Sequence, residues 1–226
     1  MNNPTHKQLQ LAPLDATGWL SEQPEDFKNW AARVGRWQHY RAGQFVYMAG
    51  DAADGVYGLA SGGLEITFPL VGGEPVVIYR AEPGFWVGEQ AGFSASPRTI
   101  SLMAAVESRI LHLPSRALEA LVAEQPKHLL SFYKLCAINL TNAITLLSET
   151  LALTVRARVC RRLLKLTEGR SEADLTQDDL AKLLGVARAT LRPCLNDLTA
   201  QGAIELGYRK IRVLNPALLA LYKDEQ

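Results

Sequence analysis

Arg188 and Arg192 are the side chains whose type and spacing most directly suggest chemistry. Residues four apart lie on one face of a helix, and a guanidinium group there can reach a guanine edge or a phosphate. The surrounding segment, LTQDDLAKLLGVARATLRPCLNDL at 175–198, predicts two short helices joined by a turn at Gly185, where glycine allows a left-handed backbone. The pattern predicts a helix-turn-helix whose second helix reads a DNA major groove, with an ordinary helical hairpin as the alternative.

The inward side of this segment is predicted from its apolar positions, with Val186 filling the angle between the helices. Pro193 lacks an N–H and clashes with the carbonyl of Ala189, so either the second helix kinks or only its first turn enters the groove. For the tip of the strand pair AIELGYRKIRVL, plain solvent exposure is the alternative to phosphate contact. The expected buried residues are Leu175, Leu180, Ala181, Leu183, Leu184, Leu191, Leu195 and Leu198, and the expected DNA contacts are Thr176, Gln177, Arg188, Ala189, Thr190, Arg192, Tyr208, Arg209 and Lys210.

A cluster of basic residues precedes the helix-turn-helix, with Glu168 as the single acid among them. Such a run is either a solvated face or a phosphate-binding surface, and its position beside a DNA-reading motif favours phosphate contact. The cluster consists of Arg156, Arg158, Arg161, Arg162, Lys165 and Arg170.

Composition bounds the remaining function classes. The 226 residues, 48% of them hydrophobic, suit a soluble protein of two domains, and the net charge of +1 means that a nucleic-acid surface must arise from local clustering. We find no Ser/His/Asp arrangement, phosphate-binding loop or metal-ligand spacing, so the sequence does not predict an enzyme. No run approaches eighteen consecutive apolar residues, from which we expect no membrane-spanning helix and no membrane partner.

Cysteine usage and the N-terminus predict a cytoplasmic protein. Cys136, Cys160 and Cys194 are odd in number and far apart, which predicts neither a disulfide framework nor a metal or iron–sulfur cluster. The first twenty residues lack the basic start and apolar run of a signal peptide. A haem group would need an axial ligand from the four histidines, and lone histidines more often serve ordinary surface or core roles. The histidines are His6, His39, His112 and His128.

Residues 36–113 consist of short β-prone runs separated by glycines, which is typical of an all-β barrel or roll. The glycines fall where strands must turn, and turn formation explains them. They are Gly43, Gly50, Gly62, Gly72, Gly73 and Gly84.

Residues 127–168 contain neither glycine nor proline and predict one very long helix, or two with a hinge near residues 154–156. One apolar stripe has heptad spacing and continues upstream through Cys136 or Ala137. A second set, Leu129, Phe132, Leu135, Ile138, Leu146 and Leu153, could pack on the helix's own domain. Two apolar faces predict a parallel homodimer, with a single amphipathic helix as the alternative. The expected dimer residues are Tyr133, Cys136, Leu140, Ile144, Leu147 and Leu151.

This order of elements resembles the Crp/Fnr family of bacterial transcription regulators. The similarity rests on YRAGQFVYMAGDAADGVYGLASGGLEITF at 40–68, on GEQAGFSASPRTIS at 88–101 and on the helix-turn-helix. It implies an α+β fold: a cyclic-nucleotide-binding-type β-roll with flanking helices at 1–125, a dimerisation helix at 126–155, and a winged helix-turn-helix at 156–226. It also implies a homodimer that binds a two-fold symmetric operator in double-stranded DNA and contacts RNA polymerase.

The resemblance further implies an effector site, with cyclic AMP as the candidate ligand. Glu89 would accept from the ribose 2′-hydroxyl, Arg98 would pair with the cyclic phosphate, and Thr99 with the backbone of Gly88, Glu89, Gln90 and Ala91 would complete the cradle. The alternative is that Glu89 and Arg98 form an ion pair with each other.

Two departures leave the effector open. Ile100 replaces a smaller residue, and the base-contacting positions fall at Ala143 and Ile144, which cannot hydrogen-bond adenine; Thr141, Asn142 or Thr145 could substitute. Another effector, or none, therefore stays possible. A nucleotide-binding regulatory subunit is the alternative of a different class, but it has no need of the C-terminal motif. For a regulator, effector binding is expected to repack the dimer helices and reorient the winged helices.

Overall fold

The computed structural model describes residues 10–70, 73, 75–94 and 96–226, and the chain divides into two compact units, residues 1–141 and 142–226. Each unit is described by itself. His6 and Gly72, named above, lie outside the described residues.

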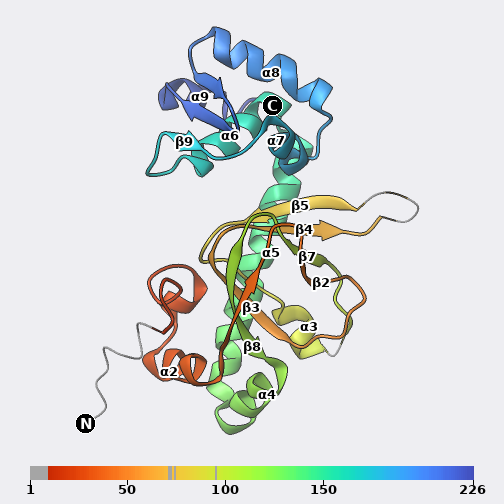
Figure 1. Cartoon of the computed structure of the whole chain (residues 1–226), viewed down its shortest axis with the longest axis vertical. Helices are drawn as coiled ribbons and strands as arrows, with labels where there is room; N and C mark the ends of the chain where they lie inside the picture. Colours follow the sequence, from red (N-terminus) through yellow and green to blue (C-terminus); the bar gives the residue numbers. More distant parts are fainter. Residues whose placement is uncertain (1–9, 71–72, 74, 95) are drawn as a thin grey trace. The chain divides into compact units, whose positions relative to one another are not determined.

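The first unit is a β-roll of two four-stranded antiparallel sheets with helices before, within and after it (Figure 1). One sheet has the order β1-β8-β3-β6 and the other β2-β7-β4-β5. The strands are β1 (Arg36–Tyr40), β2 (Phe45–Tyr47), β3 (Gly55–Ser61), β4 (Leu64–Phe68), β5 (Val76–Ala81), β6 (Trp86–Val87), β7 (Ser101–Ala104) and β8 (Ser108–Pro114). The helices are η1 (Trp19–Glu22), α2 (Glu25–Val34), α3 (Glu89–Ser94), α4 (Ser115–Glu124), η2 (Pro126–His128) and α5 (Leu129–Ala152).

The predicted β-roll is confirmed, and so is the turn conformation of four of the predicted glycines. Gly43, Gly50, Gly62 and Gly84 all have positive φ angles. At Gly62, between β3 and β4, a Cβ atom would lie 2.4 Å from the carbonyl oxygen of Glu107, so the close approach of two backbones also requires glycine.

Two apolar clusters stabilise the roll. Tyr47, Leu59, Leu64, Leu102 and Ile110 fill its interior. An aromatic cluster on the outside of the roll brings the N-terminal helices onto α5, where the indole N–H of Trp19 donates to the carbonyl of Ser131 at 2.8 Å. Its central members are Trp19, Phe27, Trp86 and Phe132.

The second apolar set predicted on the long helix is only partly correct. Phe132 and Leu135 are buried in the aromatic cluster, whereas Leu129 and Ile138 remain 49% and 40% exposed. Phe132 and Leu135 lie three apart, so they share the one face of α5 that meets the aromatic cluster.

The heptad stripe of α5 is exposed along its length. Leu130 and Ala137 extend it upstream, but Cys136, which was expected in the stripe, is half-buried and its thiol hydrogen-bonds to the carboxyl of Glu89. The inclusion of Cys136 among the stripe residues is therefore corrected: of the two residues considered at this point, the exposed Ala137 continues the stripe. The stripe consists of Leu130, Tyr133, Ala137, Leu140, Ile144, Leu147 and Leu151.

The largely apolar composition of this helix also corrects the expectation about membranes. By length and composition, Pro126–Ala152 could cross a membrane, so the absence of a long apolar run does not exclude a spanning helix. Core helices of water-soluble proteins meet the same criterion.

The second unit begins within α5 and contains a helix-turn-helix with a small antiparallel sheet of order β10-β11-β9. Of the two alternatives for residues 127–168, two helices are observed: α5 ends at Ala152, and the Thr154 side chain caps α6 by accepting from the Ala157 N–H. The elements are α6 (Val155–Leu166), β9 (Glu172–Ala173), α7 (Gln177–Leu184), α8 (Arg188–Ala200), β10 (Ile204–Gly207), β11 (Lys210–Val213) and α9 (Pro216–Tyr222).

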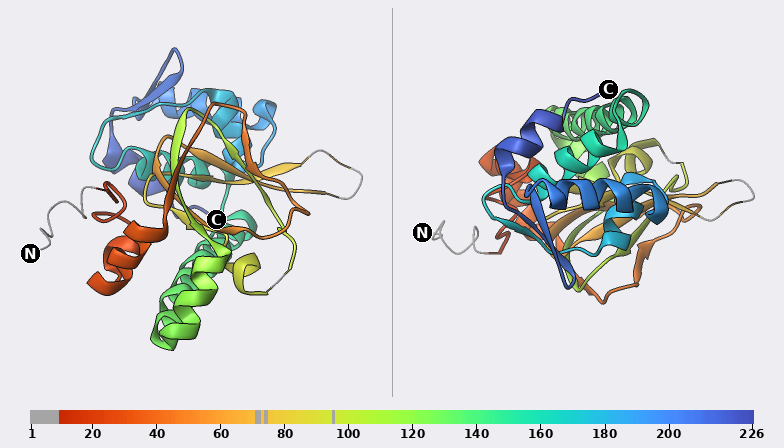
Figure 2. Two further views of the ribbon diagram at one scale, coloured as in Figure 1. Left: turned by 60° about the horizontal axis from the view of Figure 1, so that its bottom comes forward. Right: turned by 90° about the horizontal axis from the view of Figure 1, so that it is seen from above.

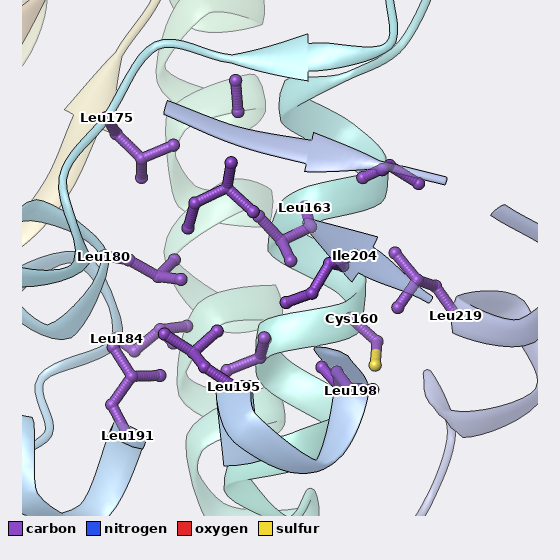
Figure 3. Close-up of a cluster of buried hydrophobic side chains, with 14 of the residues drawn as sticks. Cys160, Leu163, Leu175, Leu180, Leu184, Leu191, Leu195, Leu198, Ile204 and Leu219 are labelled. Atoms are coloured by element: carbon purple, nitrogen blue, oxygen red, sulfur yellow. The ribbon is translucent and has the colours of Figure 1, made fainter. Parts of the chain in front are cut away.

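The core of the second unit confirms the predicted inward side. Figure 3 shows Leu163 of α6, Leu180 of α7, Leu195 of α8 and Ile204 of β10 pointing toward one another. All eight residues predicted to face inward are buried.

Candidate functional site

Local capping interactions define both ends of α7, the first helix of the helix-turn-helix. Thr176 and Asp179 form a capping box at the start of α7, in which the Thr176 hydroxyl accepts from the Asp179 N–H at 3.0 Å and donates to Asp179 Oδ2 at 2.7 Å. Gly185 ends α7 with φ 61°, and the N–H of Val186 bonds to the carbonyl of Ala181 at 3.1 Å. Thr176, expected as a DNA contact, is thus committed to the cap through its side chain.

The outer face of α8, a helix drawn in blue in the right-hand view of Figure 2, carries exposed residues. An open hollow of about 540 Å³ is lined by Gln177, Arg188, Ala189, Arg192 and Asn196. Sequence reasoning missed Asn196, although it continues the four-residue spacing of the two arginines and an amide can read a base edge. Arg188 also forms an exposed ion pair with Asp178 at 3.1 Å.

Pro193 does not end the helix. The structure assigns α8 as one helix from Arg188 to Ala200 with Pro193 inside it. Pro193 and Ala189 are both exposed, so the carbonyl that loses its helical partner lies where water can solvate it.

The wing has two exposed residues, Tyr208 and Arg209, at its tip and two cations in ion pairs at its base. Tyr208 is 90% exposed, and Arg209 takes a positive φ of 55° at the turn. Lys210 instead pairs with Glu172 at 3.0 Å, and Arg212 pairs with the same carboxylate. These contacts, with Arg212 the larger contributor, hold the pKa of Glu172 below its usual value. Lys210 therefore also braces β9.

Four of the six residues of the basic cluster make contacts inside the second unit. Arg170 donates from its Nε to the carbonyl of Leu166 at 2.8 Å. Arg156 pairs with Glu225 and Asp197, and its guanidinium lies 4.4 Å from the ring centre of Tyr222. Arg161 pairs with Glu149 and Asp224. Arg158 donates to the carbonyl of Leu184. The interpretation of the cluster as a phosphate surface must be revised for these four arginines.

Arg98 lies at the centre of a buried polar site in the first unit. Its side chain donates to Asp54 Oδ1 at 2.8 Å and to the carbonyls of Gly55 and Gly88 at 2.7 and 3.2 Å, and it lies 4.2 Å from the ring centre of Tyr47. The Nε atom is buried and has no hydrogen-bond partner among the described residues. Two backbone bonds, from the Arg98 N–H to Asp51 and from the Gly50 N–H to Arg98, hold the two loops together.

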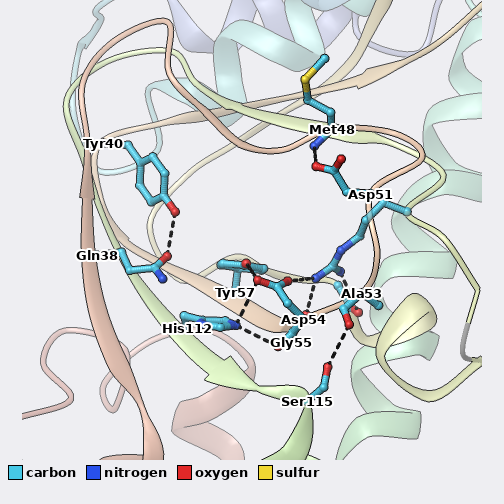
Figure 4. Close-up of polar contacts among 12 residues, drawn as sticks. Gln38, Tyr40, Met48, Asp51, Ala53, Asp54, Gly55, Tyr57, His112 and Ser115 are labelled. Carbon is cyan, nitrogen blue, oxygen red and sulfur yellow. Dashed lines mark hydrogen bonds and ion pairs between the residues drawn. The ribbon is translucent and has the colours of Figure 1, made fainter.

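Asp54 is the ionic partner of Arg98, and the predicted alternative of a Glu89–Arg98 ion pair is wrong. Figure 4 shows Asp54 accepting from the Tyr57 hydroxyl, and His112 against the Asp54 backbone carbonyl. Burial opposes ionisation of Asp54, but hydrogen bonds from Tyr57 and Arg98 outweigh it and hold the pKa of Asp54 below its usual value.

Glu89 begins α3 and is 5% exposed. Its Oε1 accepts from the Asn139 amide at 2.9 Å, whereas its buried Oε2 has no partner in the part of the chain that the structure describes. Burial raises the pKa of Glu89, and hydrogen bonds, first from Asn139, offset this only in part. An unpartnered buried carboxylate oxygen is a ready acceptor for a ligand hydroxyl.

The other predicted cradle residues divide between buried and exposed. Gly88 has φ 109°, and a Cβ there would lie 2.7 Å from Arg98 Nη1, so only glycine fits. Ala91 is buried, whereas the side chains of Gln90, Thr99, Thr141, Asn142 and Thr145 are exposed. Sequence reasoning missed Asp54, Tyr47 and Asn139, because they come from distant segments with no shared local pattern. Within the described ranges no group of three His, Cys, Asp or Glu side chains could hold a metal ion.

Comparisons with known proteins match both units. The model of the cyclic nucleotide-binding domain matches residues 37–125, and that of the Crp-like helix-turn-helix domain matches residues 157–222. A CRP-like cAMP-activated global transcriptional regulator of Mycobacterium tuberculosis is 27% identical over 79% of this chain and 84% of its own length. The cyclic AMP receptor protein of Thermus thermophilus is 28% identical over 80% and 84%. The solved structure of FixK2 from Bradyrhizobium japonicum has the same fold, with TM-score 0.74, 20% identity and coverage of 84% and 97%.

Proposed function

Because the chain belongs to the Crp/Fnr family of transcription regulators, we propose that it is a homodimer whose affinity for a two-fold symmetric DNA operator is controlled by a cyclic nucleotide. Cyclic AMP is the first candidate, since the two curated relatives are described as cAMP-activated and as a cyclic AMP receptor. The observation that supports an effector site most strongly is the buried Glu89, whose Oε2 has no partner within the described residues.

The residues of the site fit the parts of a cyclic nucleotide. Glu89 offers an acceptor to the ribose hydroxyl, and the Arg98 guanidinium offers positive charge and a free Nε–H to the cyclic phosphate. Gly88 lets the backbone approach closely. The base is left to α5, where Thr141, Asn142 and Thr145 are exposed.

On the DNA side, α8 presents Arg188 and Arg192 to base edges, and the wing presents Tyr208 and Arg209 to phosphates. Pairing two copies along the exposed stripe of α5 supplies the two-fold symmetry that a palindromic operator requires. Effector binding beside α5 then shifts the helix pair and reorients the winged helices, so that effector and DNA tighten each other's binding.

A second candidate function, a regulator that needs no anionic effector, is favoured by one observation. Asp54 already neutralises Arg98, and carbonyls of Gly55 and Gly88 accept its remaining contacts. In that case the cradle is a structural support for the roll.

Calorimetric titration with cyclic AMP and cyclic GMP separates the two functions. We expect micromolar binding of cyclic AMP that is lost in Arg98→Ala and weakened in Glu89→Gln, with the exposed Arg41→Ala as the control. Fluorescence anisotropy on a selected operator is then expected to show tighter DNA binding with the ligand. Binding of neither nucleotide, together with operator binding by the free protein, would favour the effector-independent regulator.

A further inference from the structure

One amide group joins the candidate effector site to the long helix. Asn139 lies half-buried on α5, and its Nδ2 donates to Glu89 Oε1 at 2.9 Å and to the backbone carbonyl of Trp86 at 3.1 Å. Its two N–H groups thereby bridge β6, α3 and α5. Trp86 is itself 1% exposed and packed in the aromatic cluster, so the bridge is anchored at a rigid point.

The same helix face makes a second contact with Glu89. The thiol of Cys136, three residues before Asn139, also hydrogen-bonds to the carboxyl. Both side-chain contacts of Glu89 therefore come from α5, and among the described residues Oε2 has no hydrogen-bond partner. Leu140, the residue next to Asn139, belongs to the exposed heptad stripe.

We propose that Asn139 is a positioning residue: it fixes Glu89 so that Oε2 faces an effector hydroxyl, and it links occupancy of that site to the position of α5. This inference rests on the proposed function. Because a ligand hydroxyl on Oε2 leaves the Asn139 bond intact, binding and helix position are coupled through one carboxylate that both sides share.

The charge state of Glu89 provides a measure of this role that needs no ligand. The titratable and charged groups around it are Cys136 on α5 and Tyr47 on β2, and the Arg98 guanidinium lies 4.2 Å from the centre of the Tyr47 ring. Among the side-chain contacts, the Asn139 amide is the largest that favours the ionised form of Glu89. Removing it leaves a buried carboxylate with fewer donors, which must bind its proton more tightly.

The first experiment follows the Glu89 carboxyl by NMR during a pH titration of the effector-free protein labelled with carboxyl-¹³C glutamate, the resonance being assigned with Glu89→Gln. We expect Asn139→Leu to raise the proton affinity of Glu89 by about tenfold, as for loss of one charge-assisted hydrogen bond. Asn139→Asp, which keeps the side-chain shape, should raise it further through like charge. Asn29→Leu, at a half-buried asparagine of α2, is the matched control and should leave the titration unchanged.

The second experiment is a double-mutant cycle with cyclic AMP as the probe. Asn139→Leu should weaken its binding by about tenfold in the parent protein and by less than about twofold in the Glu89→Gln background, since the residue acts through Glu89. Equal weakening in both backgrounds, or an unchanged Glu89 titration in Asn139→Leu and Asn139→Asp, would overturn the assignment. If the parent protein binds no cyclic AMP, the proposed effector is wrong, and the titration alone decides the role of Asn139.

Discussion

Dimerisation through α5 can be tested with Leu147→Asp and Leu151→Asp combined. These side chains are 58% and 78% exposed in the single chain, so the substitutions leave its own core intact. Complete burial of a leucine side chain stabilises by about 2 kcal/mol. Covering the exposed parts of both leucines in both protomers therefore contributes about 5 kcal/mol to the dimer, and loss of that contribution weakens association by more than about a thousandfold.

Sedimentation velocity at micromolar protein concentration measures the outcome. The parent protein should sediment as a dimer and the double variant as a monomer with an unchanged circular dichroism spectrum. The matched control is Leu214→Asp with Leu221→Asp, two leucines of similar exposure, 53% and 77%, outside α5. A dimer that survives the α5 substitutions, or one that is lost equally in the control, would refute the heptad stripe as the interface.

Three further predictions concern base reading, the second core and the pH dependence of stability. Arg188→Ala should weaken binding to a selected operator by about 1–3 kcal/mol more than binding to random duplex DNA, measured by anisotropy; equal losses would show a phosphate contact instead. Leu195→Ala, at a side chain 1% exposed, should lower the free energy of unfolding in urea by about 3 kcal/mol, and a loss below about 1 kcal/mol would contradict its place in the core. Because the pKa of Glu89 is raised in the folded chain, the free energy of unfolding falls as pH rises from the unfolded pKa through the folded one. Glu89→Gln should therefore raise the melting temperature more at pH 8 than at pH 4. An equal change at both pH values would show that protonation of Glu89 does not contribute to the stability of the fold.

The helix-turn-helix could be predicted because each of its features is local. Gly185 permits the left-handed turn, Thr176 and Asp179 cap α7, and the leucine spacing of two short helices defines their buried side. These features depend on residues a few positions apart, so periodicity and capping chemistry are sufficient to predict them.

The effector site could be predicted only in part. Gly88, Glu89 and Arg98 were named from one continuous segment, but their partners could not be. Asp54 lies 44 positions from Arg98, and Asn139 lies 50 positions from Glu89. The alternative of a Glu89–Arg98 ion pair arose because both residues belong to one segment, 88–101, whereas Asp54, the actual partner of Arg98, does not.

The same limit explains the corrections on α5 and α6. Cys136 lies four residues before Leu140, a spacing that the stripe permits. Its thiol nevertheless contacts Glu89, from the same face of α5 as Asn139. Arg156 and Arg161 form ion pairs with Glu225 and Asp224, which lie more than 60 positions away in the sequence. A count of charges along the chain could not show these pairs.

The sequence by itself determined the order of a β-roll, a long helix and a helix-turn-helix, since hydrophobic periodicity, glycine turns and helix caps are properties of short segments. Only the tertiary structure decided which charged groups meet. Pairing of charged side chains depends on strand register, on loops such as 50–54 and 97–99 that two backbone hydrogen bonds bring together, and on which face of α5 the aromatic cluster covers. Burial then raises the pKa of Glu89, and it leaves Glu89 Oε2 and Arg98 Nε without hydrogen-bond partners among the described residues, because desolvation depends on the folded environment of a side chain and not on its neighbours in the sequence.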